Sequence, residues 1–165
     1  MEAQGGKYLT FALSNETYGI PLQKAKEIIG MLDITHIPKT QGYIKGVVNL
    51  RGKIIPIMDL RLKFGMDGKP YTDRTCVIVI EVNVTNNRRL IGLVVDTVAE
   101  VVNIQKSEIE TPGYDAQIEG DFLMGLGKLR DKVILIIDIE KILNREEITL
   151  IKKALPENEE IESVI

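Results

Sequence analysis

Three aspartates, each at the end of an apolar run, are the residues of this chain best placed for acid–base chemistry. Asp59, Asp96 and Asp138 follow runs made mostly of Ile, Val and Leu. A cluster of carboxylates could supply a general acid and a general base. Asp59 and Asp138, however, occupy equivalent positions of an internal repeat, so we expect them to lie apart in two half-domains. Hydrogen bonding at strand ends is therefore the favoured interpretation.

The single histidine and the single cysteine do not complete a catalytic or metal site. His36 has no second histidine or cysteine at a metal-ligand spacing, and a histidine base would need a nucleophile beside it. Cys76 cannot form an internal disulfide and is interpreted as a small buried residue. The chain also lacks a Walker loop, a dinucleotide glycine fingerprint and a nucleophile elbow. We therefore predict no catalytic residue, no cofactor and no metal, which leaves surfaces as the useful features.

The composition disfavours several classes of protein. The 165 residues carry a formal charge of -3, and only 5% are aromatic, with no Trp. A nucleic-acid-binding small barrel, the alternative function considered, would be expected to show a basic face and stacking aromatic rings. No run approaches the roughly 20 apolar residues of a membrane helix, and the N-terminus has no apolar signal region. The sequence thus predicts a cytoplasmic protein without nucleic-acid binding or direct membrane insertion.

A predicted β-hairpin within residues 46–65 carries an arginine at its tip. An apolar approach leads to the tight turn Arg51-Gly52-Lys53, and the apolar run 54–58 follows. Gly52 can take the positive φ of a short hairpin turn at no steric cost. Pro56 has no backbone N–H for a sheet ladder, so we expect a sheet edge or a bulge there.

The hairpin belongs to an internal repeat. Residues 18–29 match residues 91–102, and the hairpin recurs at 129–139. The matched pairs are Gly19 with Gly92, Glu27 with Glu100, Arg51 with Arg130, Lys53 with Lys132 and Asp59 with Asp138. Asp131 stands in place of Gly52 and is expected to take the positive φ of the second turn. The repeat predicts two structurally similar halves.

The apolar pattern predicts an all-β fold of two five-stranded barrel-like halves, at about 8–70 and 71–144. Each half alone would bury too little apolar surface, so we expect a packed interface between them. The β-branched run 76–82 is typical of a strand buried on both faces. Residues 22–29 fit either a strand or one helical turn followed by a strand.

The pattern changes after Asn144. Apolar residues at helical spacing predict a short amphipathic helix at 145–155, ended by Pro156. Residues 156–165 are predicted to be an acidic flexible tail. The whole of 1–155 is then expected to form one domain.

Several separated motifs in this sequence, taken together, resemble the CheW family of chemotaxis coupling proteins. The central motif is Asn49-Leu50-Arg51-Gly52, followed by Ile54, Pro56, Asp59-Leu60-Arg61 and Phe64. Further matches are Tyr18-Gly19-Ile20, Glu27-Ile28, Ile44-Lys45-Gly46-Val47, Gly92-Leu93-Val94-Val95-Asp96 and residues 138–143. The resemblance implies two intertwined five-stranded barrels, in agreement with the repeat.

The resemblance also implies a function. Members of this family are adaptors that link the histidine kinase CheA to the cytoplasmic tips of methyl-accepting chemoreceptors, without catalysis of their own. A protein of this kind is expected to be a monomer when free. It is expected to be cytoplasmic and to associate with the membrane only through its partners.

The same resemblance assigns residues to each partner. Receptor binding is implied for Ala25, Glu27, Gly46, Asn49 and Arg51. Kinase binding is implied for Lys45, Ile54, Glu110 and Tyr114. Structural alternatives stay open: Ala25 could be a core residue, and the repeat matches of Glu27 and Arg51 could mean that they only decorate the scaffold. For Arg51 we favour function, because a guanidinium can bridge several carbonyl or carboxylate groups.

Overall fold

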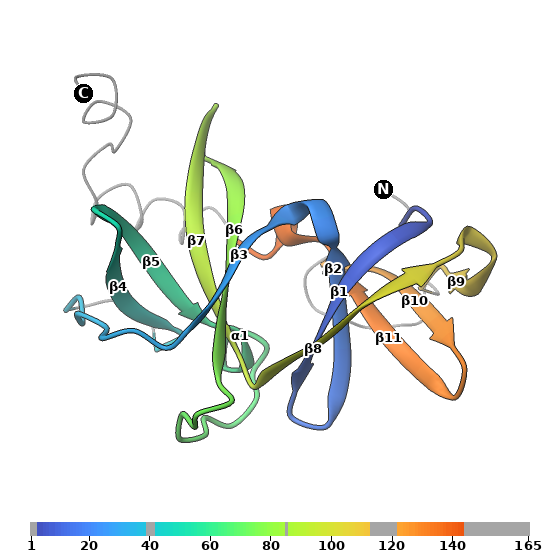
Figure 1. The fold of residues 1–165 in the computed structure, drawn as a ribbon, viewed down its shortest axis with the longest axis horizontal. Coiled ribbons are helices and arrows are strands. Elements are labelled where there is room, and N and C mark those ends of the chain that lie inside the picture. The colour runs from blue at the N-terminus through green and yellow to red at the C-terminus, as the bar shows by residue number, and fades with distance from the viewer. Residues whose placement is uncertain (1–2, 39–41, 85, 113–121, 144–165) are drawn as a thin grey trace.

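The computed structural model describes residues 3–38, 42–84, 86–112 and 122–143, which form two β-sheets lying side by side (Figure 1). The strands are β1 (Gly6–Leu13), β2 (Glu16–Pro21), β3 (Ala25–Gly30), β4 (Ile44–Leu50), β5 (Lys53–Asp59), β6 (Cys76–Val84), β7 (Asn87–Val95), β8 (Thr97–Ile104), β9 (Ile109–Glu110), β10 (Leu123–Leu129) and β11 (Lys132–Ile137). The helices are α1 (Leu60–Lys63) and the 3-10 turns η1 (Leu22–Lys24), η2 (Lys106–Glu108) and η3 (Ile139–Lys141). Residues 22–29 thus take the second predicted form, a helical turn followed by a strand.

The two sheets have the same internal order, which confirms the repeat. One sheet runs β3-β6-β7-β5-β4, and the other runs β8-β1-β2-β11-β10 with β9 added at its end. Each sheet contains one parallel pair, β5 with β7 and β11 with β2. Within those pairs Ile57 lies opposite Gly92 and Ile136 lies opposite Gly19, as the sequence repeat requires.

The halves are intertwined because the chain changes sheets twice. It leaves the six-stranded sheet between β2 and β3, and it returns to that sheet between β7 and β8. Each sheet therefore takes strands from both sequence halves, 8–70 and 71–144. The six-stranded sheet exceeds the expected five by β9, and neither sheet closes into a complete barrel.

One apolar core lies between the sheets and belongs to both. Phe11 and Ile20 from one sheet join Ile78 and Leu93 from the other, and each is at most 1% exposed. Two smaller cores lie within the individual sheets, one around Val79 and one around the residues near Ile104. The interface between the two sheets is thus the largest apolar core among the described residues.

Strand β6 separates two of these cores, as its β-branched run predicts. Ile78 and Ile80 face the shared core, whereas Val77 and Val79 belong to the core of the five-stranded sheet. All four side chains are buried. Cys76, at the start of the strand, is only partly buried, because it lies at the strand end beside the Arg74 carbonyl.

Four aromatic rings stack through the seam between the sheets. Phe11 stacks on Tyr18, Tyr18 on Phe64, and Phe64 on Phe122, with centroid separations of 6.0, 5.7 and 4.6 Å. Phe64 immediately follows α1, so the stack seats this short helix against β2 and the residue that precedes β10. Stacked aromatic pairs of this kind stabilise a fold beyond their buried area.

The structure meets the expectation for Pro56 only in part, because no β7 residue pairs with Pro56 although β5 has a neighbour on each side. Strand β5 lies inside its sheet, with β4 on one side and β7 on the other, so Pro56 is not on an edge strand. Pairing with β7 covers Ile57 to Asp59 and begins just after Pro56. The irregularity of this hairpin falls on β4, between Ile44 and Gly46.

Three predictions fall on residues outside the described ranges. They are the helix 145–155, the tail 156–165 and the role of Tyr114.

Candidate functional site

The tip of the β4–β5 hairpin is held in one shape by its own backbone. Arg51 and Gly52 have φ values of 51° and 87°, the positive φ pair that a tight two-residue hairpin turn requires. The Asn49 Oδ1 accepts a hydrogen bond from the Gly52 N–H at 2.8 Å. The Arg51 side chain, 69% exposed, therefore starts from a fixed backbone position.

Arg51 makes a two-bond ion pair with Glu27 of β3. Its Nη1 donates to Glu27 Oε1 at 2.9 Å, and its Nη2 donates to Glu27 Oε2. The hydrogen bond from Arg51 lowers the pKa of Glu27 from its ordinary value, with partial desolvation opposing it and the charge of Arg51 adding to it. Glu27 is consequently ionised at neutral pH, and its side chain is 32% exposed.

This ion pair joins the two edge strands of the five-stranded sheet. Strands β3 and β4 end the sheet on opposite sides, and Arg51 lies at the tip that continues β4. A second link joins β4 to the segment after β3, where the backbones of Thr35 and Val47 exchange hydrogen bonds of 2.8 and 2.9 Å. These two links bring the sheet toward the shape of a barrel, although no continuous ladder of hydrogen bonds joins β3 to β4.

Gly46 is required by the second link. A Cβ on Gly46 would lie 2.0 Å from the Thr35 carbonyl oxygen, and its φ of 139° disfavours any other residue. Gly46 is also buried, so it affects the neighbouring surface through the backbone that it positions. The register shift beside it places Lys45 in the bulge of β4.

The second copy of the hairpin has the arginine without the ion pair. Arg130 takes a φ of 57°, whereas Asp131 does not, which corrects the expectation that Asp131 would hold the positive φ. Within the described part of the chain, no ion pair joins Arg130 to Glu100, the counterpart of Glu27. A hollow of about 430 Å³ lies between β8 and this tip. The closed, charged tip is thus a property of the first copy.

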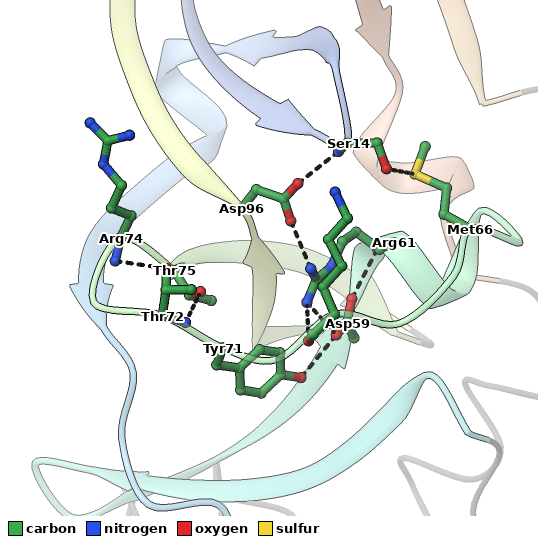
Figure 2. Close-up of polar contacts among 10 residues, drawn as sticks. Ser14, Asp59, Arg61, Met66, Tyr71, Thr72, Arg74, Thr75 and Asp96 are labelled. Atoms are coloured by element: carbon green, nitrogen blue, oxygen red, sulfur yellow. Dashed lines mark hydrogen bonds and ion pairs between the residues drawn. The ribbon is translucent and has the colours of Figure 1, made fainter.

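A buried charged network lies near α1 (Figure 2). Arg61, 3% exposed, approaches Asp96 with its Nη1 3.0 Å from Oδ1, an ion pair whose alignment falls short of a hydrogen bond. Its Nη2 lies 3.5 Å from Asp59 Oδ2 and donates to the Lys69 carbonyl at 3.1 Å. Asp59 also accepts from the Tyr71 hydroxyl at 2.9 Å. Burial, followed by the bond to Asp59, raises the pKa of Tyr71, which stays protonated at neutral pH.

The network settles how the three aspartates are used. Asp59 accepts from the Arg61 backbone N–H at 3.0 Å and caps α1, while Asp138 accepts from the Glu140 N–H at 2.9 Å and caps η3. Strand-end hydrogen bonding is confirmed for both. Asp96 also accepts a backbone hydrogen bond, from the Ser14 N–H, and in addition it shares Arg61 with Asp59. Among the described residues, no group of three or more His, Cys, Asp or Glu could hold a metal ion.

Arg61 belongs to the Asp59-Leu60-Arg61 motif, from which the sequence alone predicts no role for it. Arg61 lies two residues after an apolar strand, and the equivalent position of the second copy holds Glu140. That difference between the copies could have marked Arg61 as specific to the first. What the sequence alone does not give is the approach of Asp96, which is 35 residues further along the chain.

Comparison with known proteins decides the family. The family model described as the CheW-like domain matches residues 7–147. The chain belongs to the CheW family.

Relatives match over nearly their full lengths. The chain is 40% identical to a chemotaxis protein CheW of Klebsiella aerogenes, over 91% of this chain and 89% of that one. It is 29% identical to a chemotaxis protein CheW of Helicobacter pylori, over 85% and 82% of the two chains. The solved structure of the scaffolding protein TtCheW from Thermoanaerobacter tengcongensis superposes with a TM-score of 0.77 at 33% identity, covering 87% of this chain and 96% of that one. The expected fold and family are confirmed.

In this CheW-family protein the residues predicted for receptor binding occupy one sheet. Glu27, Asn49 and Arg51 meet at or beside the hairpin tip, where Glu27 and Arg51 are in direct contact. Ala25 begins β3 and packs partly against the shared core, as its structural alternative proposed. Gly46 is buried and supports the surface without contributing a side chain.

The residues predicted for kinase binding divide between the sheets. Lys45 and Ile54 lie on β4 and β5, and Ile54 is only partly buried against the shared core. Glu110 lies on β9 of the other sheet, exposed and paired with Lys128. Tyr114 is outside the described residues. No helix in the described segments is both long and apolar enough to cross a membrane.

Proposed function

We propose that this protein is a chemotaxis adaptor that joins the histidine kinase CheA to the cytoplasmic domain of methyl-accepting chemoreceptors, and that it acts as a scaffold and not as an enzyme. Its membership of the CheW family supports the class of function. The observation that carries the assignment of a surface is the Glu27–Arg51 pair. It is fixed, exposed and present in only one of two equivalent hairpins.

The chemistry of the tip suits a protein partner. Arg51 has five N–H donors, and the two bonds to Glu27 leave others for carbonyl or carboxylate groups of a partner. A helical receptor tip would lay its apolar face beside such a surface and place polar groups at the rim.

The two sheets allow two partners to bind together. Receptor contacts are assigned to the tip around Arg51, and kinase contacts to Lys45 and Ile54 on the same sheet and Glu110 on the other. Lys45 shares strand β4 with Asn49, whereas Glu110 lies on the other sheet, so one adaptor could bring both partners close together. Effective concentration then favours the assembly beyond either single affinity.

A bead assay tests this function. Receptor cytoplasmic fragments are immobilised, and the CheA retained on them is measured with increasing amounts of this protein. Retention of CheA is expected to rise with the amount of adaptor added and to saturate. Retention of CheA that is the same with and without the protein would contradict the proposal.

A further inference from the structure

We propose that Arg61 is a positioning residue that fixes the orientation of the two sheets, by holding Asp96 at the point where the chain crosses from one sheet to the other. The proposal rests on the adaptor function only for its consequence, because an adaptor must hold two surfaces in a set geometry. The orientation itself is a property of the free protein.

The contacts run from one sheet to the other through three residues (Figure 2). Arg61 follows β5 of the five-stranded sheet and reaches Asp96, which lies between β7 and β8. Asp96 Oδ2 accepts from the Ser14 N–H at 2.7 Å, and Ser14 belongs to the β1–β2 turn of the six-stranded sheet. The Asp96 N–H also donates to the Ala12 carbonyl at 3.0 Å.

Directional polar contacts supplement the shared core, because burial of apolar surface is itself non-directional. The aromatic stack and the close packing of the core also resist rotation of the sheets, and a polar contact adds a preferred geometry to them. A buried ion pair has a preferred geometry, and loss of one partner leaves an uncompensated charge. The exposed pair Lys24–Glu140, at 3.6 Å between η1 and η3, is weakened by solvent and constrains less.

The contact between Arg61 and Asp96 occurs in one copy of the repeat, although the strand end and the aspartate cap beside it occur in both. Asp138 repeats Asp59 as a cap, but Glu140 stands where the repeat places Arg61. Glu140 is exposed and makes no comparable buried contact in the described residues. Capping of the two short helices does not explain why one copy has Arg61 where the other has Glu140, because the capping aspartate is present in both.

Distances between spin labels test the orientation in the free protein. Labels are placed at two exposed positions on different sheets, Ile28→Cys and Val133→Cys, in a Cys76→Ser background. A second pair, Val101→Cys with Val133→Cys, lies within one sheet and reports its integrity.

The test variant is Asp96→Ala, which removes both the Arg61 contact and the acceptor for Ser14. We expect the distance between the sheets to shift by about 2 Å or more, or its distribution to broaden, with the pair within one sheet unchanged. Asp138→Ala, which removes only a cap, should leave both distances as in the parent.

A milder variant keeps the proposal testable if Asp96→Ala does not fold. Asp96→Asn preserves the side-chain shape and the acceptor for Ser14 while it removes the charge facing Arg61. It should give a smaller change in the same direction. An unchanged distance between the sheets, in whichever of the two variants folds, would overturn the positioning role. That result would leave the adaptor function intact, because no partner is present in the experiment.

Discussion

At the scale of single residues, the two hairpin tips show that residue type alone does not make a site. Arg51 and Arg130 occupy the same repeat position and both have positive φ, but only Arg51 is paired. The carboxylates that match are present in both copies, at Glu27 and Glu100. The difference lies in whether the tip approaches the edge strand on the opposite side of its sheet closely enough to form the bond.

The repeat supplies a matched control for Arg51. We expect Arg51→Ala to weaken binding to receptor cytoplasmic fragments by about tenfold or more, because it removes a charged side chain with N–H donors for the partner. Arg130→Ala, at the equivalent exposed tip, should bind as the parent does. Titration of labelled receptor fragments measures both affinities, and circular dichroism checks that both variants are folded. Equal weakening by the two substitutions would favour a scaffold role for both arginines.

The pKa of Glu27 gives a second prediction at this scale. Its folded pKa is lowered, so the ion pair contributes fully above the ordinary value of 4.5 and is lost as the pH falls through the lower folded pKa. In Arg51→Ala the midpoint should return toward the ordinary value. Side-chain carboxyl NMR over acidic pH measures the midpoint. An identical midpoint in parent and variant would mean that the pair does not form in solution.

The sequence predicts Glu27 and Arg51 as site residues but does not predict the bonds between them. The structure brings these two side chains into direct contact. Their pairing depends on the closeness of two strands at opposite edges of one sheet, which local patterns do not report. Arg61 was missed for the same reason, since its partner Asp96 arrives from another part of the chain.

At the scale of elements, backbone conformation decides how closely β4 can approach the segment after β3. Gly46 has a positive φ and no room for a Cβ beside Thr35, so it permits the bridge between Thr35 and Val47. The sequence predicted the hairpin and its turn at Gly52. It did not predict the bulge at Lys45, because a bulge leaves the apolar alternation of β4 nearly unchanged.

Substitution of Gly46 tests this reading of β4. Gly46→Ala is expected to lower the free energy of unfolding by about 2–5 kcal/mol, from backbone strain and the contact with the Thr35 carbonyl. Gly30→Ala is the control, since a Cβ there meets nothing within 4 Å, and it should change stability by roughly 0.5 kcal/mol or less. Chemical denaturation compares the two. Similar stabilities for both variants would contradict the close approach.

At the scale of the whole molecule, the two sheets depend on one another. The chain crosses between them at two places, and the shared core draws side chains from both. The repeat in the sequence predicted two similar halves and a packed interface. The exchange of strands between the halves followed only from the family resemblance, because periodicity does not say which strands pair.

This arrangement predicts that the sheets unfold together. Leu93→Ala, at a position 1% exposed in the shared core, should destabilise the protein by about 2–5 kcal/mol and lower the transition midpoint of both sheets equally. Hydrogen exchange of amides in each sheet follows the two midpoints. Ile28→Ala, at an exposed position of the same sheet, should have little effect. Separate midpoints for the two sheets would show that the core does not couple them.

The central claim is that the protein couples kinase to receptor through the tip around Arg51. Co-sedimentation of receptor cytoplasmic fragments with CheA, followed by measurement of kinase activity in the pellet, tests it most directly. We predict that activity appears in the pellet with the parent protein and with Arg130→Ala, and that it falls by about tenfold or more with Arg51→Ala. Pellet activity that is unchanged when the protein is omitted would contradict coupling, and full activity with Arg51→Ala would contradict the assignment of the tip.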